Sequence, residues 1–169
     1  MKKILTRRVF IGSALITGTI LMLMPQGSKT SIKIDYFRVI NSVQNILFPK
    51  NRDAPSANDF GATAYLINVS SHPSFLKDDL LFLYRGAREI IEKNPNFLKM
   101  SSIDKSKAID DFSKTDMGEN WLSMLLYYTI EAMLSDPIYG GNINEIGWRW
   151  LNHHTGKPQP KKPFGEKIT

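Results

Sequence analysis

Three pairs of neighbouring residues carry side chains that could do chemistry: His153 with His154, Asp110 with Asp111, and Glu89 with Glu92. Adjacent histidines on a helix or strand point in different directions, so the histidine pair is poorly placed to chelate one metal ion. The carboxylate pairs fall on the polar faces of expected amphipathic helices, which favours solvated surface charge over acid–base catalysis. We therefore predict no catalytic residue and no metal site in this chain.

The composition excludes several kinds of catalytic and cofactor site. The chain of 169 residues contains no cysteine, which excludes a disulfide, a thiolate zinc site, a cysteine nucleophile, an iron–sulfur cluster and covalently attached haem. Gly140-Gly141 lacks the strand–loop–helix context and the lysine of a phosphate-binding loop. We expect one globular domain that binds no cofactor of its own.

The net charge of +6 could suggest a nucleic-acid-binding protein, but its distribution argues against this function. Four of the charges come from Lys2, Lys3, Arg7 and Arg8, and residues 1–28 contain no acidic side chain, so the rest of the chain carries +2. That balance is ordinary for a soluble domain. We therefore predict no nucleic-acid partner.

The N-terminal segment has the layout of an export signal. A basic stretch over residues 1–8 leads into an apolar stretch over residues 9–24, which is shorter than the roughly 20 residues of a membrane-spanning helix. Its junction resembles a twin-arginine signal, and the matching residues are Thr6, Arg7, Arg8, Phe10 and Ile11. An ordinary secretory signal with two chance arginines is the alternative. No small-x-small cleavage site precedes residue 31, which leaves open that the segment stays attached as an anchor at the inner membrane.

Twin-arginine export carries folded proteins, which in general means that a cofactor is inserted before transport. This chain shows no site for a large cofactor, so the signal is better explained if it serves a partner protein that is exported together with it. We expect a periplasmic location.

Helical spacing of apolar residues recurs along the chain, and no strand-like alternation is found. The pattern predicts one helix from the N-cap Asp35 to Pro49, a shorter one from Asp59 to about residue 70, and one from Leu76 to Lys93 that Asn94-Pro95 breaks. A modest helix capped by Ser102 and a last helix that starts in a capping-box pattern at Asp116 complete the set. We predict an all-α fold: a small, irregular helical bundle over residues 29–155, preceded by a signal helix in residues 1–28. A long loop-rich C-terminal segment ends in an extended tail over residues 156–169.

The last predicted helix is apolar nearly all round between Trp121 and Leu134. A helix of this kind is either central in its own bundle or covered by another chain. Both explanations stay open from the sequence.

The segment after this helix combines turn formers with large aromatic residues. Gly140 and Gly141 permit a sharp turn, and Tyr139, Trp148 and Trp150 suit a protein interface or a platform for sugars. A tight turn that returns Trp148 to the core is the third possibility.

The run Ser135-Asp-Pro-Ile-Tyr-Gly-Gly-Asn142, followed by Ile146-Gly-Trp148, resembles the C-terminal signature of the gluconate 2-dehydrogenase subunit 3 family. Leu47-Phe-Pro49 and Phe60-Gly-Ala62 also resemble that family, over most of the chain from Asp35 to Trp148. The tail after Trp150 departs from the family pattern.

The resemblance implies a non-catalytic small subunit. In that family a flavin-dependent (FAD) subunit of the glucose-methanol-choline type oxidises a sugar or sugar acid, and a multihaem cytochrome c often passes the electrons onward. The small subunit carries the export signal through the twin-arginine translocase and supports maturation of its partner. The residues expected at the partner interface are Trp121, Tyr128, Asp136, Pro137, Tyr139, Gly140, Gly141, Asn142, Gly147 and Trp148. An independent periplasmic helical sugar-binding protein that uses Tyr139, Trp148 and Trp150 is the alternative.

Overall fold

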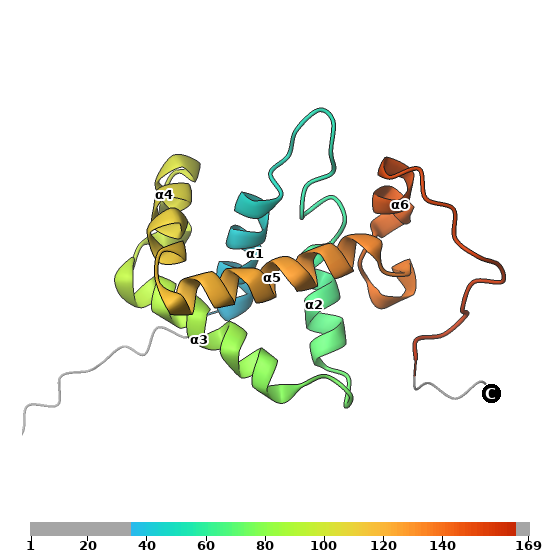
Figure 1. Ribbon diagram of the computed structural model, residues 1–169, viewed down its shortest axis with the longest axis horizontal. Coiled ribbons are helices and arrows are strands. Elements are labelled where there is room, and N and C mark those ends of the chain that lie inside the picture. Colours follow the sequence, from blue (N-terminus) through green and yellow to red (C-terminus); the bar gives the residue numbers. More distant parts are fainter. Residues whose placement is uncertain (1–34, 165–169) are drawn as a thin grey trace, which may run out of the picture. The chain divides into compact units, whose positions relative to one another are not determined.

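The computed structural model describes residues 35–164, and these residues form helices joined by loops, with no strand among them (Figure 1). The all-α prediction is therefore confirmed, whereas the predicted signal segment lies outside the described residues. The α-helices are α1 (Tyr36–Leu47), α2 (Ala62–Ser70), α3 (Lys77–Lys93), α4 (Ser102–Ser113), α5 (Asp116–Leu134) and α6 (Ile146–Trp150). Short 3-10 helices are η1 (Phe97–Lys99), η2 (Pro137–Tyr139) and η3 (Ile143–Glu145).

The first two helices begin where local backbone chemistry allows. Asp35 caps α1, because its carboxylate accepts a hydrogen bond from the amide of Arg38 at 3.3 Å, as predicted. The predicted start of α2 at Asp59 is wrong by three residues. The Asp59 carboxylate instead accepts from the amide and the hydroxyl of Ser56, and Gly61 has a left-handed φ of 73° that a helix cannot include.

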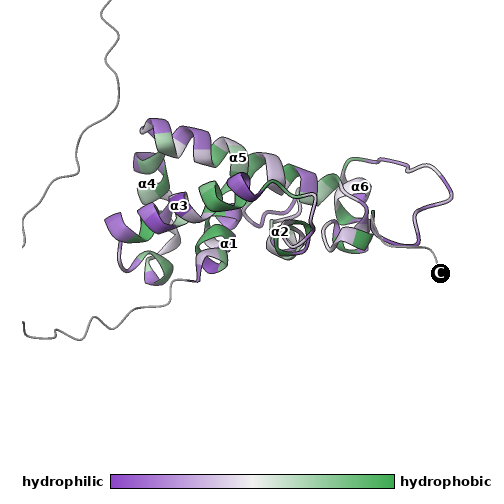
Figure 2. Ribbon diagram, turned by 90° about the horizontal axis from the view of Figure 1, so that it is seen from below, coloured by the Kyte–Doolittle hydropathy of each residue, from purple (hydrophilic) through white to green (hydrophobic). Residues whose placement is uncertain are grey.

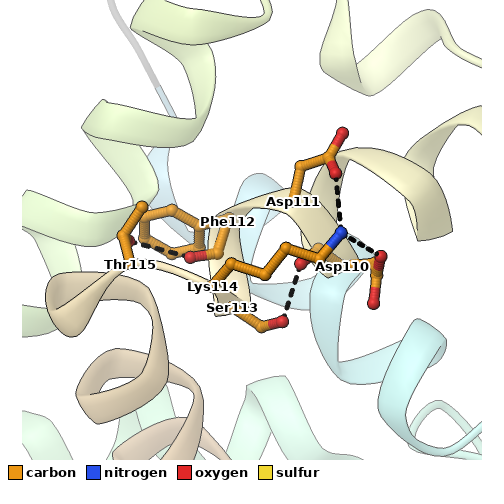
Figure 3. A network of polar contacts seen from close by, with 6 residues as sticks. All are labelled: Asp110, Asp111, Phe112, Ser113, Lys114 and Thr115. Carbon is orange, nitrogen blue, oxygen red and sulfur yellow. Dashed lines mark hydrogen bonds and ion pairs between the residues drawn. The ribbon is translucent and has the colours of Figure 1, made fainter.

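The capping residues of α4 and α5 each lie one position before the residue that the sequence pattern indicated. Ser101, not Ser102, accepts from the amide of Asp104, and Thr115, not Asp116, accepts from the amide of Gly118 at 3.0 Å. Figure 3 shows the junction between the two helices, where the Lys114 ammonium group lies 2.8 Å from Asp110 and 3.0 Å from Asp111. This carboxylate pair therefore forms an exposed ion-pair cluster at a helix end.

Helix α5 is the element that the rest of the bundle packs against, since α1, α2, α3, α4 and α6 all contact it (Figure 1). Trp121 is fully buried at the crossing with α3, and its indole N–H donates to the Leu83 carbonyl at 2.9 Å. Gly86 makes this crossing possible, because a Cβ atom there would overlap the Trp121 ring. Buried side chains of α1, α3, α4 and the N-terminal part of α5 join into the larger of two hydrophobic clusters.

A buried polar chain fixes α1 and α2 against α5. Gln44 and Thr129 are fully buried, and the Gln44 amide donates to the Thr129 hydroxyl at 3.2 Å. The Thr63 hydroxyl of α2 donates to the carbonyl oxygen of the same Gln44 side chain at 2.6 Å. Because buried amides are costly when unpaired, these bonds hold the three helices in one register.

The two sides of α5 have different surroundings, which answers the question that its apolar sequence raised. Figure 2 shows α5 along one edge of the helical region, with α1, α2 and α6 on one side of it. Leu125, Ala132 and Met133 are buried against these neighbours, whereas Leu126, Ile130 and Leu134 are each about 40% exposed: 39%, 38% and 41%. Helix α5 is thus both central to its own bundle and open on its outer face. Among the described helices, none is long and apolar enough to cross a membrane.

Candidate functional site

The chain reverses direction immediately after α5, through what we call the C-terminal loop (residues 135–148). The Asp136 carboxylate accepts from the amide of Ile138 at 3.0 Å, and Pro137 supplies the first position of η2. Gly140 then adopts a φ of 87°, and its amide donates to the Pro137 carbonyl at 2.9 Å. The Asp-Pro-x-Tyr-Gly run therefore encodes one compact turn.

The second half of the C-terminal loop satisfies backbone groups that the end of α5 leaves free. The Trp148 indole N–H donates to the Leu134 carbonyl at 2.8 Å, and the side-chain amide of Asn142 donates to the Ser135 carbonyl at 3.0 Å. The Asn142 side-chain oxygen accepts from the amide of Gly147 at 2.8 Å. The last carbonyls of a helix have no partner within it, so these side chains fasten the loop onto the helix end.

Glycine residues let the two backbones approach each other closely. A Cβ atom at Gly141 would overlap the Ala132 carbonyl oxygen, and one at Gly147 would overlap the Met133 carbonyl oxygen. The Asn68 amide of α2 donates to the Tyr139 carbonyl at 3.2 Å, beside Gly140. The C-terminal loop is consequently held by α5 on one side and by α2 on the other.

Six of the ten residues predicted at the partner interface are buried within the chain itself. These are Trp121, Tyr128, Gly141, Asn142, Gly147 and Trp148. They act mainly from the interior, by packing and by hydrogen bonds, and among them Tyr128 also lines the groove described below. Asp136, Pro137, Tyr139 and Gly140 are partly exposed, and for them the interface assignment stays a prediction.

The aromatic platform of the sugar-binding alternative does not form. Trp148 is 7% exposed, because the chain turns back and places its ring on the end of α5. Trp150 lies elsewhere, with its indole N–H donating to the Asp53 carbonyl at 2.7 Å.

Tyr139 instead lies at an aromatic groove of about 630 Å³ between α2 and α5. Tyr65 and Asn68 come from α2, Tyr127, Tyr128 and Glu131 from α5, and the connection before α3 supplies residues 71–76. Ile138 and Tyr139 of η2 and Pro163 and Phe164 of the tail complete the lining. The groove therefore extends from the C-terminal loop to the middle of α5.

Two phenols of the groove, those of Tyr65 and Tyr128, have a raised pKa. Burial, followed by the charge and hydrogen bond of Glu131, raises the pKa of Tyr65. Burial, followed by its hydrogen bond to Asp79 at 2.6 Å, likewise raises the pKa of Tyr128. Glu131 is the charged side chain among the lining residues. The groove is therefore an apolar, aromatic surface with one acidic group, which suits recognition better than proton transfer.

The other residues considered for chemistry lie apart from this groove. Glu89 pairs with Lys93 at 2.8 Å and Glu92 pairs with Arg88 at 3.5 Å, both on the surface of α3. His153 and His154 are exposed after α6. In residues 35–164 no three histidine or carboxylate side chains gather in a way that could hold a metal ion.

Of the groove lining, sequence reasoning named Tyr128 and Tyr139 as interface residues, but it did not single out the other lining residues or the exposed face of α5. Tyr127 is 62% exposed beside buried Tyr128, and Leu126, Ile130 and Leu134 follow one another at four-residue spacing. This spacing was a usable signal, because it places three apolar side chains on one line along a helix. We call these three residues the outer stripe.

The sequence matches the family described as gluconate 2-dehydrogenase subunit 3 over residues 35–156, well over half of the chain. The chain belongs to this family. The match begins at the residue that caps α1 and ends shortly after α6, so it contains every helix of the bundle and the C-terminal loop. Residues 157–164 of the tail lie beyond it.

Membership of the gluconate 2-dehydrogenase subunit 3 family identifies the chain as a small subunit of a dehydrogenase complex. The comparisons with curated proteins and with solved structures gave no significant match.

Proposed function

We propose that this chain is the non-catalytic small subunit of a periplasmic dehydrogenase complex, and that it assists the maturation and export of a flavin-containing catalytic subunit. Family membership carries the proposal. The exposed apolar face of α5, held rigid by the C-terminal loop, supplies a surface for a partner.

The outer stripe has the features of a protein interface. Leu126, Ile130 and Leu134 leave apolar area in contact with water, and exposed patches of this kind mark contact sites. The stripe ends at Leu134, and there Trp148 and Asn142 fix the helix end through hydrogen bonds to the carbonyls of Leu134 and Ser135. Since a preorganised surface loses little entropy on binding, the buried side chains of Asn142 and Trp148 strengthen association by fixing the end of α5.

The N-terminal segment supports export as the purpose of this partnership. Residues 6–11 resemble a twin-arginine signal, and a flavin that is bound without a covalent link has to be inserted before its protein leaves the cytoplasm. We propose that a catalytic subunit of the glucose-methanol-choline type, which holds FAD, crosses in folded form with this chain. In the periplasm a multihaem cytochrome c takes the electrons onward, and an uncleaved signal holds the complex at the inner membrane.

The double variant Arg7→Lys with Arg8→Lys tests the export role, because it keeps the charge and removes the guanidinium pair. Dye-linked dehydrogenase activity is measured separately in periplasm and cytoplasm. We expect the activity to remain in the cytoplasm in this variant. The matched control, Lys2→Arg with Lys3→Arg, is expected to export normally. Normal periplasmic activity in the first variant would contradict the proposal.

A further inference from the structure

The tail after α6 has an unusual composition and returns to the body of the protein. Residues 156–164 read Gly-Lys-Pro-Gln-Pro-Lys-Lys-Pro-Phe, which favours an extended backbone. Figure 1 shows this red segment leaving α6 and looping back rather than leading away. It ends at the aromatic groove, where Pro163 and Phe164 are part of the lining.

Specific contacts hold the tail along this path. The Phe164 amide donates to the Tyr139 hydroxyl at 3.1 Å, and the Phe164 ring lies 6.4 Å from the His72 ring, centroid to centroid. Nearer to α6, the side-chain amide of Gln159 donates to the Glu145 carboxylate at 3.3 Å and to the Thr155 hydroxyl at 3.1 Å. The tail is thus tied to η3, to η2 and to the connection before α3.

The groove and the tail are chemically matched. Aromatic-lined grooves bind extended proline-rich segments, because such segments lose little conformational entropy on binding. The phenols of Tyr65, Tyr127, Tyr128 and Tyr139 provide this lining, and Glu131 provides a negative charge. The tail offers Pro163 next to an aromatic ring, and residues 156–164 carry three lysines and no acidic group.

We propose that the aromatic groove between α2 and α5 binds an extended proline–aromatic segment, and that this segment is the chain's own tail, which is seated at the rim of the groove through Pro163 and Phe164. The tail forms a strap that can be displaced, since Pro163 is partly buried while Phe164 remains 75% exposed. Tethering makes such a small contact effective, because a linked segment has an effective concentration in the millimolar range. This inference does not rest on the proposed function.

Hydrogen exchange in the purified full chain tests the strap, with the amide of Phe164 and the amides of residues 71–76 as reporters. Phe164→Ala and deletion of residues 157–169 are both expected to speed exchange at residues 71–76 on the order of fivefold. Tyr139→Phe keeps the ring and removes the acceptor oxygen, so it is expected to speed exchange at the Phe164 amide. Lys157→Ala, in an exposed position outside the groove lining, is the matched control and is expected to leave both unchanged.

A synthetic peptide of residues 156–164, added at millimolar concentration to the deleted chain, is expected to restore slow exchange at residues 71–76. The same peptide with alanine in place of Phe164 is expected to be at least fivefold less effective. Equal exchange in the full and deleted chains, or equal effects of the two peptides, would overturn the proposal. Protection that disappears when a dimer is diluted to monomers would also overturn it, because the tail would then come from a second copy.

Discussion

Asn142 holds the turn after α5 through both atoms of its side-chain amide, and it does so in a left-handed conformation with a φ of 45°. Asn142→Gly separates the two effects, since glycine tolerates this φ but makes neither hydrogen bond. We expect the free energy of unfolding to fall by about 2 kcal/mol. Urea unfolding followed by circular dichroism measures it.

Asn144→Gly is the matched control for this change. Asn144 also has a positive φ, of 54°, but it is exposed in the middle of η3. The stability of this variant is expected to stay within about 0.5 kcal/mol of the wild type. Equal losses in both variants would show that the hydrogen bonds of Asn142 do not hold the loop.

Gly86 marks the closest approach between α3 and α5. Gly86→Ala improves helix propensity but drives a methyl group into the Trp121 ring, so we expect a loss of about 1–3 kcal/mol. Thermal and urea unfolding both report on this loss. Gly156→Ala is the control, because nothing lies within 4 Å of a Cβ atom there. A stabilised Gly86→Ala protein would mean that the two helices can separate freely.

Tyr128 predicts how stability depends on alkaline pH. Burial and its hydrogen bond to Asp79 raise the pKa of this phenol above the usual value near 10, so the folded state favours the neutral form. The resulting stabilisation is fully present below about pH 10 and is lost as the pH rises further, once unfolded chains ionise. Tyr128→Phe is expected to cost about 1 kcal/mol at pH 8 and to make the decline above pH 10 less steep.

Urea unfolding at pH 8 and at pH 10.5 distinguishes these expectations. Tyr127→Phe alters an exposed phenol next to Tyr128 in the chain and serves as the comparison. An unchanged slope between the two pH values in Tyr128→Phe would contradict the role assigned to burial and Asp79.

At the level of elements, α5 combines a core-forming face with a contact face. Changing all three residues of the outer stripe to glutamine is expected to leave the urea midpoint nearly unchanged, because each side chain is already about 40% exposed. Losing about 1 kcal/mol of contact energy at each position would weaken association with the partner on the order of 100-fold. Co-purification with the catalytic subunit at increasing dilution measures this.

The control for the outer stripe uses exposed apolar residues on other helices. Leu81 of α3 is 60% exposed and Ile103 of α4 is 80% exposed. Changing both to glutamine is expected to leave co-purification unchanged. If this pair weakened association as much as the outer stripe does, the partner would not be bound by α5.

The periodic elements were predictable from sequence, and the contacts between them were not. The spacing of Leu83, Ala87 and Ile90 correctly predicted a helix at α3, because one buried helix face produces apolar residues at regular intervals. Leu76 repeats the same spacing yet precedes α3 and is 67% exposed. Whether an apolar residue lies against a neighbour depends on tertiary packing, which a one-dimensional pattern does not contain.

The same limit explains the candidate site. The aromatic residues of the C-terminal loop were recognisable, but Trp148 points inward because the Leu134 carbonyl needs a donor at the end of α5. The aromatic groove combines residues from α2, α5 and the tail, which are up to a hundred positions apart. Only folding brings these residues together, so no local sequence motif predicts the groove.

At the scale of the whole molecule, the described residues form a scaffold built around α5. Its hydrophobic core is divided between a larger cluster around Trp121 and a smaller one around Phe60, and α5 contributes to both. Side chains of the C-terminal loop are used to complete the end of α5, and the carboxylate pairs are used in surface ion pairs. The use of these polar side chains to stabilise the fold fits the proposal of a small subunit that presents a rigid surface to a catalytic partner.

The most direct test of this account is purification of the full chain from the periplasmic fraction of cells that produce it, with an absorption spectrum of every fraction that contains it. The account predicts that flavin absorbance and dehydrogenase activity co-elute with the wild-type chain and are lost from the outer-stripe variant. A wild-type chain that elutes alone, free of flavin, and binds sugars as a monomer would contradict it.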